Sequence, residues 1–169
     1  TPMNLANFRI GGETSKDLTI FDCNKVYLDA LDMSTSGGGL NVDQNSTVQV
    51  NACTFGTDLI VDNNCTIYGH NTTWGNNVTT TNSKLTLRKC TVNVTLTANK
   101  TALTLLKTTV QKYTYMNHSV DDYGRNLDCV IFQCTLGRGY NDGYFYSAAV
   151  RTWLVGNQMR RSRMSGELY

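Results

Sequence analysis

Residues 40–110 read LNVDQNSTVQVNACTFGTDLIVDNNCTIYGHNTTWGNNVTTTNSKLTLRKCTVNVTLTANKTALTLLKTTV, and one structural unit repeats in them almost four times. Its buried-type positions recur at spacings of 18 or 19 residues. The four columns are Val48, Ile67, Leu85 and Leu103; Phe55, Trp74, Val92 and Val110; Leu40, Leu59, Val78 and Leu96; and Cys53, Thr72, Cys90 and Thr108. Four columns that share one period indicate a repeat architecture.

The local pattern inside each unit identifies the kind of repeat. Segments such as Val48-Gln49-Val50 and Leu85-Thr86-Leu87 alternate apolar and polar residues, which is typical of a strand with one buried face. Polar groups such as Asp62-Asn63-Asn64 separate the strands, and Asn and Asp suit tight corners. A unit this short buries its apolar face only if it is one coil of a stack, with coils about 4.8 Å apart. The sequence therefore predicts an all-β fold, a parallel β-helix (solenoid) of about seven coils with about 18–19 residues each.

The column pattern and the Asn- and Thr-rich coils, such as residues 45–50 (NSTVQV) and 99–105 (NKTALTL), resemble a known group of proteins. They resemble right-handed parallel β-helices of the pectate-lyase-like kind, and among these the shafts of bacteriophage tail spikes and tail fibres. The resemblance covers about two thirds of the chain. It implies a virion protein, assembled in the host cytoplasm as a homotrimer beside other virion proteins. A right-handed winding is the usual one for parallel crossovers. Because this fold carries lyases, hydrolases, adhesins and inert shafts, the resemblance specifies architecture more than function.

The coils divide the chain, expected to be a single β-helix domain over 1–169, into three parts. Residues 1–33 form an opening segment and a first coil, and 34–110 form the regular coils. In 111–169 the period lengthens, since Leu136 stands 26 residues after Val110 and Met159 a further 23 on. Extra residues in a solenoid lie in surface loops, so loop insertions are predicted at 111–126 and 137–147.

Composition narrows the possible partners. The formal charge is +2 and 17% of residues are charged, so nothing indicates a strongly charged partner. No apolar run approaches the roughly 20 residues of a membrane span. The six cysteines contain no Cys-x-x-Cys pair, and Cys53 and Cys90 should lie two coils apart, about 9–10 Å, too far for a disulfide. We therefore expect free buried thiols, no metal and no cofactor. The basic run at 160–163 is interpreted as a solvated tail, with no nucleic acid and no membrane as partner.

An enzyme is the weaker alternative. Asp121 and Asp122, with Asp142 on the second insertion, are the carboxylates that could act as acid and base on a sugar chain. By resemblance to β-helix lyases, Arg125 or Arg138 would stand for the arginine beside an acidic calcium site. The Asn-Thr-Asp, Gly-His-Gly and Arg-x-Lys motifs of the polygalacturonase type are absent from the sequence.

A binding surface is the interpretation that the insertions favour. Tyrosine rings offer flat apolar faces for a sugar's CH groups, and Asn, Asp and Arg offer polar groups for its hydroxyls. The candidate ligand-binding residues are Tyr113, Tyr115, Tyr123, Arg125, Arg138, Tyr140, Asp142 and Tyr144. Because the insertions follow consecutive coils at matching positions, these residues are expected to share one patch. The alternative is that the tyrosines pack between subunits.

The function expected from the sequence is that of a structural β-helix in a viral (bacteriophage) fibre or spike that contributes to recognition of a host-surface polysaccharide. Two alternatives stay open: a polysaccharide-degrading tail-spike enzyme, either a lyase or a glycoside hydrolase, and a bacterial surface adhesin located outside the cell.

Overall fold

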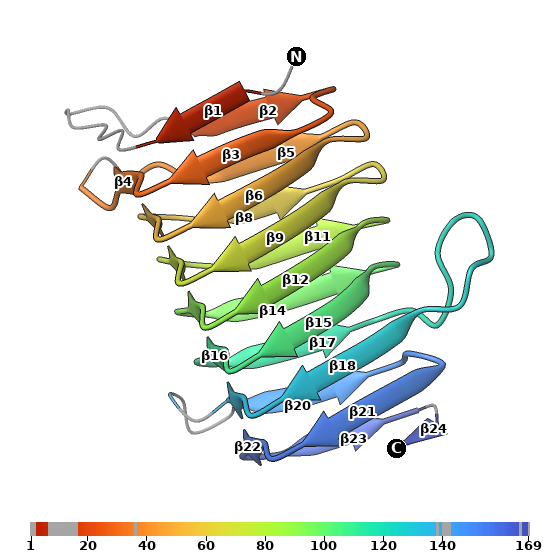
Figure 1. Cartoon of the computed structure of the whole chain (residues 1–169). Coiled ribbons are helices and arrows are strands. Elements are labelled where there is room, and N and C mark those ends of the chain that lie inside the picture. The colour runs from red at the N-terminus through yellow and green to blue at the C-terminus, as the bar shows by residue number, and fades with distance from the viewer. Residues whose placement is uncertain are drawn as a thin grey trace.

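A computed structural model of the chain describes residues 3–6, 17–35, 37–137, 139, 143–165 and 167–168. These residues form β-strands and irregular segments without any helix, and the strands lie in three parallel sheets. No helix with the length and apolar character of a membrane span occurs among them. Figure 1 shows flat coils stacked along one axis. The prediction of an all-β parallel solenoid with about 7 coils is confirmed.

Each coil passes through the three sheets in the same order, and we name them sheets C, A and B. Among the described residues, sheet C consists of β2 (Leu18–Phe21), β5 (Leu40–Asp43), β8 (Leu59–Val61), β11 (Val78–Thr81), β14 (Thr95–Asn99), β17 (Tyr113–Met116), β20 (Tyr144–Ser147) and β23 (Ser162–Met164). Sheet A consists of β1 (Met3–Ala6), β3 (Val26–Asp29), β6 (Thr47–Asn51), β9 (Thr66–His70), β12 (Lys84–Arg88), β15 (Ala102–Leu106), β18 (Asp128–Phe132), β21 (Arg151–Val155) and β24 (Glu167–Leu168). Sheet B consists of the two-residue strands β4 (Asp32–Met33), β7 (Thr54–Phe55), β10 (Thr73–Trp74), β13 (Thr91–Val92), β16 (Thr109–Val110), β19 (Thr135–Leu136) and β22 (Gln158–Met159).

The direction of the strands gives the handedness of the stack. In Figure 1 the sheet A strands run from right to left in front, and the sheet C strands run from left to right behind them, while the chain descends from its N-terminus. A chain that circles in this sense as it advances winds right-handed. This is the usual hand of parallel crossovers.

The core is made of the columns that the sequence predicts. Val48 lies in register with Ile67, Ile67 with Leu85, and Leu85 with Leu103. Each of these side chains is buried. In the neighbouring column the rings of Phe55 and Trp74 stack with centroids 4.6 Å apart. Outward positions such as Gln49 and Thr86 are partly exposed, so the predicted strand register is correct.

The corner between sheets A and B explains why one column of the repeat contains cysteine and threonine. The first of its two residues has a left-handed backbone with φ between 49° and 63° in seven described coils, at Ala30, Ala52, Asn71, Lys89, Lys107, Gln133 and Gly156. In the first corner the second residue is Leu31. In later coils its side chain accepts a backbone N–H from the preceding coil, as at Cys53, Thr72, Thr108, Cys134 and Asn157. Cys90 N–H donates to Thr108 Oγ1, and Thr108 N–H donates to Cys134 Sγ, each at 3.4 Å. Hydroxyl and thiol groups suit this position because each both donates and accepts.

The thiols are free, as predicted, and the corners add a reason for their presence. Of the six cysteines, Cys23 is partly exposed and the other five are buried. The Cys90 thiol donates to Arg88 O at 3.4 Å, so it caps the backbone of its own corner. Burial raises the pKa of the Cys90 thiol to about 11 and that of the Cys129 thiol to about 12. These groups are therefore protonated hydrogen-bonding side chains at neutral pH.

The corner between sheets C and A explains why the period changes from 19 to 18 residues. In the longer coils this corner contains two consecutive residues with left-handed backbone, at 44–45 and 63–64. In the shorter coils it contains one, Asn82 or Lys100. Across the longer corners Asn64 Nδ2 donates to Asn45 Oδ1 at 3.0 Å, so these asparagines stack.

Both predicted insertions have narrower bounds than the sequence indicates. The segment 111–126 contains β17, which pairs with β14 as a regular strand of sheet C, so its extra residues lie within 117–126. The segment 137–147 contains β20, which pairs with β17, so its extra residues lie between Gly137 and Gly143. The bounds of the first insertion are wrong because the polar Thr114 occupies a core position that Leu96 fills in the coil before.

The two insertions also leave the stack at different corners. The extra residues 117–126 follow β17, at the corner between sheets C and A. The extra residues after Gly137 follow β19, at the corner between sheets B and C. The prediction that the insertions follow consecutive coils at matching positions is therefore wrong.

Candidate functional site

Four tyrosines form a two-by-two array on the outer face of sheet C. Tyr113 and Tyr115 lie on β17, and Tyr144 and Tyr146 lie opposite them on β20. Successive residues of a strand face opposite sides. Because Thr114 and Phe145 point into the core, the tyrosine rings on either side of them point outward. We call Tyr113, Tyr115, Tyr144 and Tyr146 the tyrosine array.

The rings of the tyrosine array form one continuous surface. The ring centroids of Tyr113 and Tyr115 are 5.5 Å apart, those of Tyr115 and Tyr144 are 5.9 Å apart, and those of Tyr144 and Tyr146 are 6.5 Å apart. All four residues are partly exposed. The array is therefore a broad aromatic face that both contacts itself and meets solvent.

Polar side chains border the tyrosine array on both sides. Lys112 places its ammonium 5.0 Å from the centroid of the Tyr113 ring. On the preceding strand, Thr95 and Thr97 stand in register with Tyr113 and Tyr115. On the following strand, Arg163 stands in register with Tyr146. Hydrogen-bonding groups thus lie beside the apolar rings, as a sugar-binding surface requires.

The structure brings together some of the predicted site residues and separates others. Tyr113, Tyr115 and Tyr144 are neighbours, but through strand pairing and not through loop bases. Tyr123 and Arg125 lie on the loop 117–126, which is attached at the corners between sheets C and A. Arg138, Tyr140 and Asp142 lie outside the described residues. Tyr146 belongs to the array although the sequence interpretation omitted it; the alternation in Tyr144-Phe145-Tyr146-Ser147 is the signal that identifies it.

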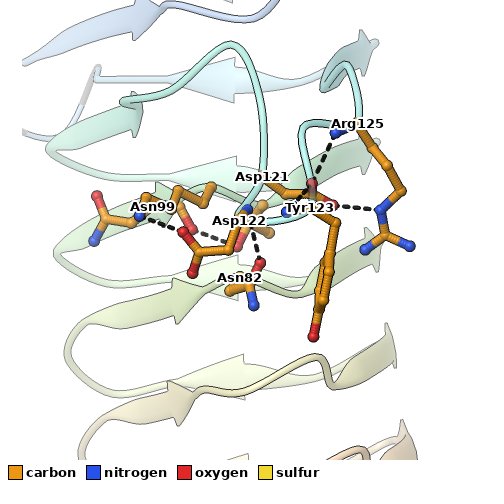
Figure 2. A network of polar contacts seen from close by, with 8 residues as sticks. Asn82, Asn99, Asp121, Asp122, Tyr123 and Arg125 are labelled. Carbon is orange, nitrogen blue, oxygen red and sulfur yellow. Dashed lines mark hydrogen bonds and ion pairs between the residues drawn. The ribbon is translucent and has the colours of Figure 1, made fainter.

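The loop 117–126 is organised around Asp121. Its carboxylate accepts hydrogen bonds from the backbone N–H groups of Tyr123 and Arg125, each at 2.9 Å. It also forms an ion pair with the Arg125 guanidinium (Figure 2). The backbone turns through Gly124, which has a φ of 72°. The Arg125 guanidinium in turn lies 5.0 Å from the Tyr123 ring centroid. Tyr123 itself is 64% exposed at the surface of the loop.

The loop folds back over coils that precede it in the sequence. The Asp122 N–H donates to Asn82 Oδ1 at 3.3 Å, two coils away, and its carboxylate pairs with Lys100. Figure 2 shows the loop lying across these corners. At its base, Asn117 Nδ2 donates to Asn99 Oδ1 at 2.6 Å. The loop is therefore attached to the outside of the C–A corners.

These contacts assign a structural role to the predicted catalytic carboxylates that the structure describes. Partial burial raises the pKa of the Asp121 carboxyl, but hydrogen bonds from Arg125 and Tyr123 outweigh it, so the pKa lies below its ordinary value. A general acid needs the opposite shift. Asp122 is paired with Lys100, and Asp142 lies outside the described residues. Within the described ranges, no group of three or more His, Cys, Asp or Glu residues is arranged to hold a metal ion.

No known protein family, curated protein or solved structure matches this chain. Functional inference therefore rests on the geometry of the site. The tyrosine array supplies apolar rings with polar neighbours on a rigid sheet, an arrangement suited to binding.

Proposed function

We propose that this chain is a structural β-solenoid of a viral fibre or spike whose tyrosine array binds carbohydrate on a host surface. The observation that carries the proposal is the array itself, four rings on two paired strands with successive centroids 5.5 to 6.5 Å apart. Side chains of a parallel sheet alternate faces, so such an array places its rings at the surface without disturbing the core.

The chemistry of the array favours a sugar over a purely apolar ligand. Tyrosine presents an apolar ring that packs on the CH face of a pyranose, and a hydroxyl that hydrogen-bonds at its edge. Lys112, Thr95, Thr97 and Arg163 offer additional donors and acceptors around the rings. The rigid stack beneath fixes the backbone of both strands, which reduces the entropy lost on binding.

Assembly as a homotrimer with other virion proteins is part of the same proposal. It is supported by an apolar strip on the outer face of sheet A, at one end of the stack. Leu106, Phe132 and Val155 stand in register there, and Phe132 is 37% and Val155 52% exposed. Contiguous exposed apolar residues favour a protein contact. Sedimentation equilibrium tests this part, and a stable 18.8 kDa monomer would contradict it.

The test of carbohydrate binding uses Tyr115→Ala and Tyr144→Ala, with Tyr123→Ala as the matched control. Tyr123 is an exposed tyrosine on the loop 117–126 with the Arg125 guanidinium 5.0 Å from its ring, so it offers a similar ring and cation outside the array. The proteins are applied to immobilised bacterial capsule and lipopolysaccharide. Loss of one ring is expected to weaken binding by roughly tenfold while melting temperature holds.

Two results would contradict the proposal. Equal binding by all three variants would show that the tyrosine array does not bind the carbohydrate. A fall in melting temperature with binding intact would make the tyrosines assembly contacts, which is the alternative interpretation of these residues.

A further inference from the structure

A groove of about 340 Å³ lies on the outer face of sheet A, across β6, β9 and β12. Its two walls are rows of outward side chains in register, Gln49–Tyr68–Thr86 and Asn51–His70–Arg88. The backbone of Val50 and Gly69 forms the floor between the rows. We call this the sheet A groove; it is on a different sheet from the tyrosine array.

A hydrogen-bonded chain fixes the orientation of His70 at the wall of the groove. Asn51 Nδ2 donates to the Asp29 carboxylate at 2.6 Å, so the amide oxygen of Asn51 faces the other way. That oxygen lies 3.1 Å from His70 Nδ1. An amide oxygen only accepts, so Nδ1 must carry the proton. In the neutral ring the lone pair then sits on Nε2, which is left as an acceptor.

Arg88 is the next residue of the same row, and its guanidinium has no ion-pair or hydrogen-bond partner among the described residues. Tyr68, in the opposite wall, is 39% exposed and offers an aromatic ring. The groove therefore combines one unpaired cation, one ring, one oriented acceptor, and the neutral polar groups of Gln49 and Thr86. A guanidinium binds a carboxylate through two parallel hydrogen bonds.

We propose that the sheet A groove binds a carboxylated sugar unit, such as a hexuronate residue of an acidic polysaccharide. The Arg88 guanidinium pairs with the carboxylate, His70 Nε2 accepts a hydrogen bond from a sugar hydroxyl, and the Tyr68 ring packs on the CH face. A volume of about 340 Å³ accommodates a small ligand of this size. This site does not depend on the tyrosine array.

The test measures binding to the full chain by calorimetry, with three probes: a hexuronate trisaccharide, the matching neutral hexose trisaccharide, and inorganic phosphate. Arg88→Gln is expected to weaken binding of the hexuronate roughly tenfold to a hundredfold, because it removes a charge-assisted pair. Lys107→Gln is the control, since it removes one exposed positive charge elsewhere. Gln133 occupies the equivalent corner of the next coil with a φ of 52°, so glutamine suits that backbone.

The proposal predicts binding of hexuronate in the wild type and in Lys107→Gln, weak binding in Arg88→Gln, and no comparable binding of the neutral sugar. Equal binding of the neutral hexose would show that the carboxylate is not recognised. Equal binding of phosphate would show that the groove binds anions in general. Either result would overturn the proposal, as would the absence of any binding. Tyr115→Ala should leave hexuronate binding unchanged, which separates failure of this site from failure of the array.

Discussion

The substitution Thr108→Val tests how much the side-chain hydrogen bonds at the corner between sheets A and B contribute to stability. Valine keeps the shape of threonine but has no hydroxyl, so the change removes hydrogen bonds and leaves packing nearly intact. In the structure Thr108 Oγ1 accepts the Cys90 N–H at 3.4 Å, and its hydroxyl lies 3.1 Å from Leu87 O and 3.2 Å from Leu106 O, the two carbonyls between which its donated proton is shared. Leu106 O also accepts the Lys89 N–H at 2.8 Å, so it keeps a partner.

The cost therefore comes mainly from the buried Cys90 N–H, which loses its acceptor. An orphaned buried donor costs about 1–3 kcal/mol, and the long 3.4 Å bond places this one toward the lower half of that range. We expect Thr108→Val to lower the free energy of unfolding by about 1–2 kcal/mol, or the melting temperature by roughly 2–8 °C. Thr108→Cys should cost less, because cysteine occupies the same corner in the coils before and after.

Thr80→Val is the matched control for this measurement. Thr80 is as buried as Thr108, yet its Oγ1 has no hydrogen-bond partner within the described part of the chain. The same change should therefore be neutral or stabilising there, since it removes an unsatisfied polar group. Urea unfolding of both variants decides the matter. If Thr80→Val and Thr108→Val were equally destabilised, the loss would come from packing and the hydrogen-bonding role of the corner would be refuted.

Three further outcomes are expected. Leu85→Ala should lower the free energy of unfolding by about 2–5 kcal/mol, because it empties a buried core position, whereas Thr86→Ala on the outer face should change it little; chemical unfolding measures both. Burial raises the Cys90 thiol pKa from its ordinary 9.0 to about 11, so the folded chain keeps a proton that the unfolded chain releases. The contribution of this thiol to the free energy of unfolding is therefore fully present below pH 9 and should fall as the pH rises toward 11. Melting temperatures measured over a series of pH values would show this fall. Asp121→Asn should loosen the loop 117–126 and speed its cleavage by a protease with little effect on melting, whereas Asp22→Asn, at the exposed corner of the first coil, should leave the cleavage rate unchanged.

The regular part of the fold was predictable because its signal is redundant. Columns such as Val48, Ile67 and Leu85 each require an apolar residue in successive coils, and independent columns carry the same period. The signal weakens where a polar residue takes a core position. Thr114 stands between Leu96 and Phe145 in the stack, so the apolar column is interrupted there and does not identify β17 as a strand.

The candidate site was predictable only in part, for a related reason. Strand alternation predicts that Tyr113 and Tyr115 share a face, and pairing with the next coil places Tyr144 beside them. The fold-back of the loop depends on contacts such as Asp122 with Asn82, which are 40 residues apart and have no periodic signature. The orientation of His70 likewise depends on a chain of side-chain contacts across three coils.

The position of the loop 117–126 has a consequence for how this surface can change. The connection between sheets C and A lengthens from residues 100–101 in one coil to 117–127 in the next, between two and three doublings, so the added cost of loop closure is only about 1.5 kcal/mol. Because each coil contacts mainly its neighbours, that cost remains local to the coils around the corner. Foreign peptides inserted at the C–A corners should therefore be displayed without refolding of the stack, and the solenoid can exchange surface loops by recombination at these points.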